Sequence, residues 1–438
     1  MRLRALGASA GLSALFIVVY GGCNWLTAHR AHVGTVAFAW ERLIPFVPLT
    51  IPAYLSIDLF FVAAPFLCRS ERELTIFAKR IAAAIVIAGI CFLLFPLRFV
   101  FGRPQASGWI GSAFDWFRAM DAPFNQFPSL HIALCSILVV TYGRHTRGML
   151  RGAVVAWFVL IAASAVLTYQ HHVLDLIGGF ALAGYCFYFI PEATADIEPT
   201  TNPRVGSYYL VGALLCGMAA LLLWPLGSIL LWPAFSLALV AAAYFRFGAA
   251  VYRKSSGLLP WSTIWSLGPC LLGQHISRWW YRRRCRAWDA VAQNVWIGSA
   301  LSTREANVAV AAGVSAVLDL TAEFSAPKSF RRLRYCNIPV LDLTAPTPQQ
   351  LDEIVSFIAE EARRGIVYVH CKIGYSRSAV AAGAYLIANG HTADEAIAIL
   401  RHARPSIVIR PEALAVIHAL EAAHAIEFVL ASAEQRPV

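Results

Sequence analysis

Eight apolar runs, each about as long as a bilayer is thick, occupy the first 247 residues of this 438-residue chain. A helix needs about 20 apolar residues to cross the hydrocarbon core, where its backbone groups can bond only to one another. Only 14% of the residues are charged, against about 25% in soluble domains. This composition excludes a disordered chain, a coiled coil and a single soluble globule. The runs predict a polytopic membrane domain over residues 1–247, with about eight spans near 8–29, 45–68, 80–97, 128–143, 151–170, 172–190, 206–224 and 227–245.

The positive charges of the short loops predict an orientation for these spans. Arginine and lysine gather at 69–80, 144–151 and 246–254. Because cytoplasmic loops are enriched in both residues, the N-terminus and the C-terminal domain are expected in the cytoplasm. We therefore expect a multi-pass protein of the cell inner membrane.

A basic and aromatic linker is expected over residues 248–288, which hold seven basic and no acidic residues. Its stretch 256–276 is apolar enough for a ninth span, but Pro260 and Pro269 interrupt it. Arginine interleaved with tryptophan is typical of a segment that lies on anionic lipid. We favour an interfacial segment, with a ninth span as the alternative.

A soluble α/β domain is predicted over residues 289–438, where 13 basic and 15 acidic residues nearly balance. The net charge of +11 therefore belongs to loops and the linker, which argues against a nucleic-acid partner. Ten scattered cysteines without a CxxC pair argue against a disulfide framework and a zinc site, and no cofactor or metal is expected. Short β-branched runs and capped segments predict buried strands at 314–320 and 365–370, and helices at 347–364, 376–389 and 392–402. The expected fold class is thus a multi-span α-helical membrane domain followed by a soluble α/β domain, a central sheet flanked by helices.

The segment His370-Cys371-Lys372-Ile-Gly374-Tyr-Ser376-Arg377-Ser378 lies between a predicted strand and a predicted helix. A loop in that place directs backbone N–H groups and a helix N-terminus at one anion. The same positive environment lowers the pKa of a thiol, so Cys371 can be a thiolate at neutral pH. Arg377 can bind two phosphate oxygens, and Gly374 permits a tight turn.

This segment resembles the His-Cys-x5-Arg-Ser/Thr signature of the cysteine-dependent protein phosphatases of the dual-specificity type. The resemblance implies that Cys371 attacks phosphorus to form a cysteinyl-phosphate. It implies further that Arg377 binds the phosphate and that Ser378 helps the thiolate to leave. The loop residues expected to orient or bind the substrate are His370, Lys372, Gly374 and Ser376.

Asp342 is the candidate general acid, since such an acid must protonate the leaving oxygen. It follows a predicted strand, 29 residues before Cys371, a kind of position in which dual-specificity phosphatases keep their acid. The alternative is an aspartate that caps a turn. Lys372 resembles a lysine that lipid-directed members often carry, which favours an inositol-lipid or glycerophosphate-lipid headgroup. A solvated lysine is the alternative, and Tyr375 replaces a second basic residue that some lipid phosphatases have.

A second cluster of ionisable residues is predicted at one membrane face. Ser129 and His131 open the fourth run, while the segment from His171 to Asp175 leads from the fifth run into the sixth. The spacing of His171 and Asp175 places them on one helical face, where the carboxylate can orient the imidazole. Ionisable residues at span ends are costly unless they serve a site.

This cluster resembles the type 2 phosphatidic acid phosphatase superfamily over about residues 45–190. The resemblance implies that His171 is the nucleophile, Asp175 its orienting partner and His131 the acid. It also implies that Arg103 and Ser129 contact the phosphate.

Three positions depart from that superfamily's pattern. Pro96 stands in place of a lysine, for which Arg98 could substitute, Leu130 replaces a glycine, and Ala165 replaces an arginine. Inositol-phosphorylceramide and sphingomyelin synthases likewise show His-x3-Asp without that arginine. The second site is therefore a hydrolase, a transferase or a structural remnant.

Together these motifs predict a membrane-bound phosphatase that hydrolyses phosphomonoesters in its cytoplasmic domain, favouring lipid headgroups, with a histidine site on the outer face. One alternative is a membrane-anchored protein tyrosine/serine/threonine phosphatase. Another is a lipid headgroup phosphotransferase with an accessory phosphatase. The expected partners are a phospholipid or phosphoprotein substrate and membrane lipid.

Overall fold

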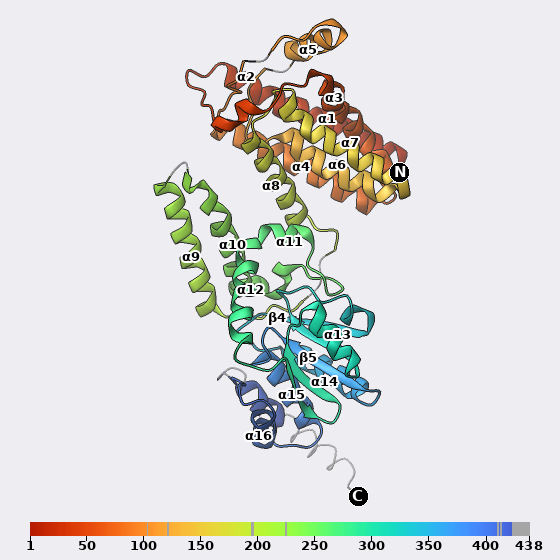
Figure 1. The fold of residues 1–438 in the computed structure, drawn as a ribbon, viewed down its shortest axis with the longest axis vertical. Coiled ribbons are helices and arrows are strands. Elements are labelled where there is room, and N and C mark those ends of the chain that lie inside the picture. Colours follow the sequence, from red (N-terminus) through yellow and green to blue (C-terminus); the bar gives the residue numbers. More distant parts are fainter. Residues whose placement is uncertain are drawn as a thin grey trace, which may run out of the picture. The chain divides into compact units, whose positions relative to one another are not determined.

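The computed structural model describes residues 1–102, 104–120, 122–193, 197–223, 226–409, 411 and 414–422. The chain divides into two compact units, residues 1–193 and 194–438. Figure 1 shows helices throughout the first unit and both helices and strands in the second.

The first unit is a helical bundle whose apolar core is built around α6, which packs against α4, α7 and α8. Ser70 caps α4 by accepting a hydrogen bond from Glu73 N, and Ser129 caps α6 in the same way from Ile132 N. Its helices are α1 (Arg2–Phe16), α2 (Gly22–Ala28), α3 (Ile51–Ala63), α4 (Glu71–Leu94), α5 (Gly108–Met120), α6 (Leu130–His145), α7 (Gly148–Leu167) and α8 (Val173–Phe189).

All eight apolar runs form helices, but two of these helices are short. Among the described residues, six helical segments are long and apolar enough to cross a membrane: Arg2–Ala28, Pro48–Leu67, Glu71–Leu94, Gly148–Leu167, Pro203–Leu222 and Gly227–Tyr252. The fourth and sixth runs form α6 and α8, with 16 and 17 residues. Each begins directly after a polar N-cap residue, Ser129 for α6 and His172 for α8, and neither helix has the 18 residues of a candidate span.

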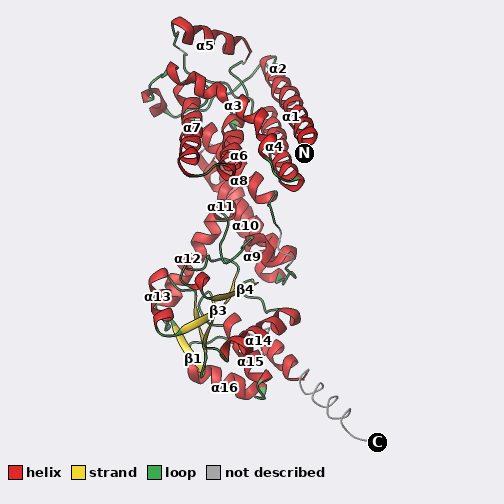
Figure 2. Cartoon of the chain, turned by 90° about the vertical axis from the view of Figure 1, so that its right-hand side faces the viewer, coloured by secondary structure: helices red, strands yellow, loops and turns green. Residues whose placement is uncertain are grey.

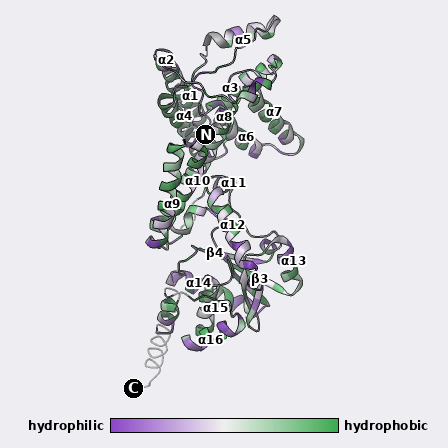
Figure 3. Cartoon of the chain, turned by 60° about the vertical axis from the view of Figure 1, so that its left-hand side comes forward, coloured by the Kyte–Doolittle hydropathy of each residue, from purple (hydrophilic) through white to green (hydrophobic). Residues whose placement is uncertain are grey.

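The second unit begins with a helical part that consists of α9 (Pro203–Leu222), α10 (Leu231–Ala242), α11 (Trp261–Ser266) and α12 (Gly268–Arg282). Helices α9 and α10 pack side by side as a hairpin, and α12 packs on α10. Figure 3 shows apolar residues along α9, in contrast to the mixed surface of the α/β part.

The α/β part confirms the predicted strands and helices. In the described chain its sheet has the order β1-β2-β5-β3-β4, with β5 parallel to both of its neighbours. Figure 2 shows strands of this sheet in yellow. Helices α14, α15 and α16 cover one face, while α13 packs on the other. The elements are β1 (Trp288–Ala292), β2 (Val295–Ser299), α13 (Thr303–Ala311), β3 (Val314–Thr321), β4 (Arg334–Val340), α14 (Pro348–Ala362), β5 (Ile366–Cys371), α15 (Arg377–Ala388) and α16 (Ala393–Ala403).

Residues 255–282 leave the α/β part and return to it. At the start, Ala326 N donates a hydrogen bond to the carbonyl of Gly257 (2.7 Å). At the end, Arg278 Nη1 donates to the carbonyl of Ala300 (3.1 Å). Between these points lie the two helices α11 and α12, which meet at Leu267 and pack on α10. Both ends of this segment therefore contact the same domain.

Candidate active site

Cys371 ends the central strand β5, and α15 begins six residues later at Arg377. The loop between them wraps around the sulfur, since Cys371 Sγ accepts from Gly374 N (3.3 Å) and lies 3.5 Å from Ser378 Oγ. Gly374 has φ +83°, and a Cβ there would lie 2.7 Å from the backbone of Gly298. Only glycine fits this turn, as the sequence predicts.

The electrostatics of the loop favour a thiolate. Burial raises the pKa of Cys371, but the positive charge of Arg377 and hydrogen bonds from Ser378 and the backbone outweigh it. The net pKa of the thiol therefore lies below its ordinary value. The loop therefore favours the thiolate, which is the nucleophilic form of cysteine.

Arg377 is buried and held in place by a carboxylate that the sequence analysis missed. Its Nη2 and Nη1 donate to the two oxygens of Glu323, at 2.7 and 3.2 Å, and Nη1 also donates to the carbonyl of Val340 (2.8 Å). Both side chains of the pair are almost fully buried. Glu323 follows β3 closely, so it fixes the guanidinium at the edge of the sheet where Cys371 lies.

Asp342 lies within reach of the catalytic loop, as expected of an acid. One carboxylate oxygen is 3.3 Å from Arg377 Nη2, and the other accepts from Lys372 Nζ at 3.3 Å. The side chain is 30% exposed, so it borders the opening of the site. Burial raises the pKa of Asp342, but the charges of Arg377 and Lys372 outweigh it and hold the pKa below its ordinary value.

His370 lies beneath the loop beside a buried carboxylate. Its Nε2 is 3.7 Å from Asp319 Oδ1, and neither ring nitrogen has a hydrogen-bond partner among the described residues. Asp319 Oδ2 accepts from Lys254 Nζ (2.6 Å) and from the hydroxyl of Tyr335 (2.7 Å). Lys254, from the linker, also donates to the carbonyl and hydroxyl of Thr321. A lysine outside the α/β part thus neutralises the carboxylate next to His370.

Side chains from the helical part of the second unit reach the opening of the site. Gln274 of α12 accepts a hydrogen bond from Lys372 Nζ (2.7 Å). Tyr244, in the turn after α10, donates its hydroxyl to the carbonyl of Asp342 (2.8 Å). Asn202, which caps α9, donates to the carbonyl of Leu343 (2.8 Å). The candidate acid and Lys372 therefore contact helices that precede the α/β part in the chain.

In the first unit, the segments that carry His131 and His171 meet at the starts of α6 and α8, where Ser129 N donates to the carbonyl of Asp175 (3.0 Å). His131 stacks on the ring of Tyr54, with centroids 4.1 Å apart. His171 Nδ1 is 3.7 Å from Asp175 Oδ2. Among the described residues, no group bonds to His131 Nε2 or His171 Nδ1. The structure thus brings His131, His171 and Asp175 together, and one ring nitrogen of each histidine makes no hydrogen bond to a described residue.

The other candidates at this site differ in their surroundings. Ser129 is fully buried, and its hydroxyl caps α6 while its N–H donates to the carbonyl of Asp175 (3.0 Å). Arg98 is exposed, and its backbone N–H donates to the carbonyl of Gly34. Arg103 lies outside the described residues.

His172 is buried and paired with a carboxylate. Its Nδ1 is 2.8 Å from Glu41 Oε2, and its Nε2 accepts from Val100 N (3.3 Å). Because Nε2 accepts a hydrogen bond, Nδ1 carries the proton and donates to Glu41. The ring also stacks on Phe99 at 4.3 Å. This second histidine–carboxylate pair fixes the loop that carries Arg98.

Two family models match the chain over separate stretches. Residues 14–189 match the PAP2 superfamily, and residues 295–422 match the dual specificity phosphatase catalytic domain. The chain joins a PAP2-superfamily domain to a dual-specificity phosphatase catalytic domain. This confirms the fusion that the two motifs predict, and the second domain is of the phosphoric monoester hydrolase class.

Similar proteins match the dual-specificity phosphatase domain. Tyrosine-protein phosphatase cdcA of Emericella nidulans is 33% identical over 105 residues, which are 23% of this chain and 18% of that protein. The CDC14 homolog of Schizosaccharomyces pombe, also a tyrosine-protein phosphatase, is 32% identical over 106 residues, 24% of this chain and 20% of that protein. The chain thus spans about a fifth of the length of these curated relatives.

Solved structures also align with this domain. The active form of Tk-PTP is 29% identical, covers 31% of this chain and 96% of its own, and has a TM-score of 0.29. PTPMT1 is 25% identical, covers 32% of this chain and 98% of its own, and has a TM-score of 0.30.

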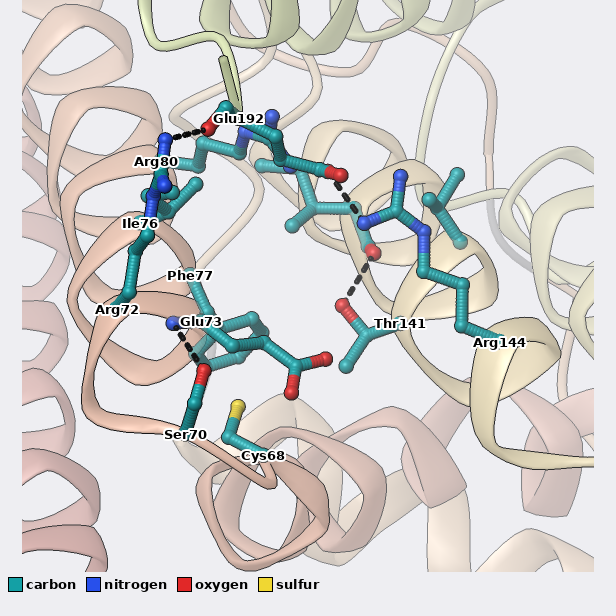
Figure 4. A pocket seen from close by; sticks show the side chains of 12 residues that line it. Cys68, Ser70, Arg72, Glu73, Ile76, Phe77, Arg80, Thr141, Arg144 and Glu192 are labelled. Atoms are coloured by element: carbon teal, nitrogen blue, oxygen red, sulfur yellow. Dashed lines mark hydrogen bonds and ion pairs between the residues drawn. The ribbon is translucent and has the colours of Figure 1, made fainter.

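A polar cavity of about 280 Å³ lies in the PAP2-superfamily unit at the end of α6 opposite His131 (Figure 4). Glu192 lies between Arg80 and Arg144, and it accepts from Arg80 Nη1 at 3.1 Å and from Arg144. The backbone carbonyl of Glu192 accepts from Arg72. This carboxylate offsets part of the positive charge that predicts a cytoplasmic loop here.

Proposed function

We propose that the dual-specificity phosphatase domain hydrolyses phosphomonoesters on lipid headgroups of the membrane in which the chain is embedded. The supporting observation is the contact of Lys372 and Asp342 with Gln274 and Tyr244. Tyr244 belongs to a segment long and apolar enough to cross a membrane, and Gln274 to the helix that packs on it. A site bordered by such helices is more accessible to a lipid headgroup at the bilayer surface than to a bulky protein substrate.

The reaction begins with attack of the Cys371 thiolate on phosphorus, which forms the S–P bond while the P–O bond to the headgroup breaks. Asp342 gives its proton to the leaving oxygen. Arg377, fixed by Glu323, binds two of the equatorial oxygens as charge develops on them. Water then attacks the cysteinyl-phosphate and loses a proton to Asp342, while Ser378 donates to the departing sulfur.

The protonation state of Asp342 links binding to catalysis. In the empty site, Arg377 and Lys372 keep its pKa below the ordinary carboxyl value. A bound phosphate neutralises those cations and places negative charge beside Asp342, and both effects raise its pKa. Substrate binding therefore favours the protonated acid, and turnover of a poor leaving group should decline as the pH rises.

Phosphate release by the detergent-solubilised full-length protein tests this proposal. Phosphatidylglycerophosphate, phosphatidic acid, phosphoinositides and a phosphotyrosine peptide are compared side by side, with Cys371→Ser as the control. Lipid turnover that disappears in the variant supports the proposal. Lipid turnover that survives in a variant carrying both Cys371→Ser and His171→Ala contradicts it.

A membrane-anchored protein phosphatase is the second candidate for this domain. It is favoured by the two curated relatives, both of which are tyrosine-protein phosphatases. Turnover of the phosphopeptide alone, lost in Cys371→Ser, would establish this function instead.

We also propose that the PAP2-superfamily unit carries a histidine-based lipid phosphatase site on the outer face of an inner membrane. The support is that a hydrogen bond from Ser129 N to the carbonyl of Asp175 joins the starts of α6 and α8, and that His171 Nδ1 lies 3.7 Å from Asp175 Oδ2. Among the described residues, His131 Nε2 and His171 Nδ1 have no hydrogen-bond partner. His171→Ala should remove any phosphatase activity that persists in Cys371→Ser membranes. Turnover that requires an added alcohol would identify a headgroup transferase, and unchanged turnover would refute the site.

The orientation that we propose puts the N-terminus and the phosphatase domain in the cytoplasm. The start of α9 and the end of α10 both contact this domain, through Asn202 and Tyr244. A hairpin with both ends on one side returns the chain to the side from which it came.

A further inference from the structure

The loop that carries Asp342 has a backbone conformation that needs support. In this acid loop, residues 341–344, Leu343 has φ +62°. A leucine adopts the left-handed region only when its surroundings hold it there. Within the loop itself, Thr344 donates from its N–H and its hydroxyl to the carbonyl of Leu341, at 3.3 and 2.9 Å.

Three contacts hold the acid loop from outside the catalytic domain. The hydroxyl of Tyr244 donates to the carbonyl of Asp342, and the amide of Asn202 donates to the carbonyl of Leu343, both at 2.8 Å. Thr200 Oγ1 lies 3.1 Å from the hydroxyl of Thr344. Two consecutive carbonyls, including that of the candidate acid, thus accept hydrogen bonds from the helical part.

Asn202 and Tyr244 also hold one another. Asn202 N donates to the carbonyl of Tyr244 (2.9 Å), and Asn202 Oδ1 caps α9 by accepting from Val205 N (3.3 Å). Tyr244 is 2% exposed and stacks in parallel on Tyr209 of α9, with ring centroids 5.5 Å apart. The two residues therefore join the start of α9 to the end of α10 at the point where both meet the acid loop.

We infer that Asn202 and Tyr244 are positioning residues for the general acid, so that the α9–α10 hairpin completes the active site of the phosphatase domain. This inference rests on the proposed function, in which Asp342 protonates the leaving oxygen. The hydrogen bonds fix the backbone of the acid loop. Arg377 and Lys372 then direct the carboxylate of Asp342 into the site. Protonation of the leaving group consequently depends on helices that the family model of the catalytic domain does not include.

Leaving-group dependence in the full-length protein tests this role. Tyr244→Phe removes one hydroxyl and keeps the ring, and Asn202→Asp keeps an acceptor for the cap on α9 but loses the donor to Leu343. Each variant should slow hydrolysis of a short-chain lipid phosphate by about tenfold, since a displaced acid protonates an alkyl oxygen poorly. Hydrolysis of p-nitrophenyl phosphate, whose leaving group needs little protonation, should change less than twofold by the same principle.

Two further variants separate positioning from general damage. Tyr208→Phe is the matched control, since Tyr208 is exposed on α9 and its hydroxyl accepts from Arg204. It should leave both activities unchanged. In an Asp342→Ala background, Tyr244→Phe should have no additional effect, because it acts through the missing carboxylate.

The outcomes distinguish this inference from the proposed function. A tenfold, alkyl-selective loss that vanishes in Asp342→Ala supports the inference. Equal slowing of both substrates, no slowing, or a loss that persists in Asp342→Ala overturns it while leaving the cysteine mechanism intact. Turnover retained by Cys371→Ser in a His171→Ala background, or equal slowing of both substrates by Asp342→Ala, would instead overturn the mechanism itself.

Discussion

Replacing Lys254 by methionine should destabilise the phosphatase domain strongly. Lys254 and Asp319 are each 1% exposed, with Nζ and Oδ2 2.6 Å apart. Removal of one partner from a buried ion pair leaves an uncompensated charge, which costs about 3–5 kcal/mol. For a unit of this size, 1 kcal/mol shifts the melting temperature by about 2–4 °C. Thermal unfolding of the detergent-solubilised protein should therefore show a decrease of roughly 6–20 °C.

The control is Lys328→Met, because Lys328 is exposed. Asp319→Asn combined with Lys254→Met removes both charges and should recover part of the loss. A decrease in melting temperature no larger than that of Lys328→Met would refute the reasoning. A double variant whose melting temperature decreases by more than the two single decreases added together would refute it as well.

The decrease in melting temperature caused by Lys254→Met should depend on pH, because the pKa of Asp319 is shifted in the folded protein. Burial raises the pKa of Asp319, but the charges of Lys254 and His370 outweigh it, so its folded pKa lies below the unfolded value of about 3.9. A depressed carboxyl pKa contributes stability above the unfolded pKa, and this contribution is lost as the pH falls. The melting difference between wild type and Lys254→Met should narrow as the pH falls from about 5 to about 3.

Two further predictions concern the catalytic loop. Iodoacetamide should alkylate Cys371 with a pH midpoint below 9, because Arg377 and hydrogen bonds lower the pKa of its thiol. Cys336 should react at higher pH, since burial raises its pKa to about 11. Equal midpoints for the two cysteines, measured by mass spectrometry, would contradict the thiolate. Glu323→Gln should lower kcat by about tenfold or more with both aryl and alkyl phosphates, since it releases Arg377. A loss restricted to alkyl phosphates would assign Glu323 to the acid step instead.

The residues of the catalytic loop could be predicted because they are contiguous. Cys371, Gly374 and Arg377 lie within seven positions, and one strand–loop–helix unit fixes their geometry. Asp342 required only one more rule, its place in the loop that follows another strand of the sheet, β4. Local patterns of this kind also predict the strands and helices of the α/β part.

The partners of these residues come from distant parts of the chain, and no local pattern indicates them. Glu323 lies 54 residues before Arg377, and Lys254 lies 65 residues before Asp319. Two carboxylates at the end of a buried strand, Asp319 and Glu323, were a usable signal, since such groups need buried cations. Tyr244 and Asn202 gave no signal, because an aromatic residue and a helix cap at span ends are ordinary.

The return of residues 255–282 to the phosphatase domain has a consequence for where this enzyme can act. A domain on a flexible tether could reach another vesicle. Here, hydrogen bonds at Gly257 and Arg278 join the phosphatase domain to both ends of the α11–α12 segment, which packs on α10. In the topology that we propose, its catalytic opening stays at one depth and one orientation relative to the bilayer. Catalysis should be confined to the leaflet that surrounds the protein, in cis. Proteoliposomes mixed with protein-free substrate vesicles should release phosphate only after the two populations fuse.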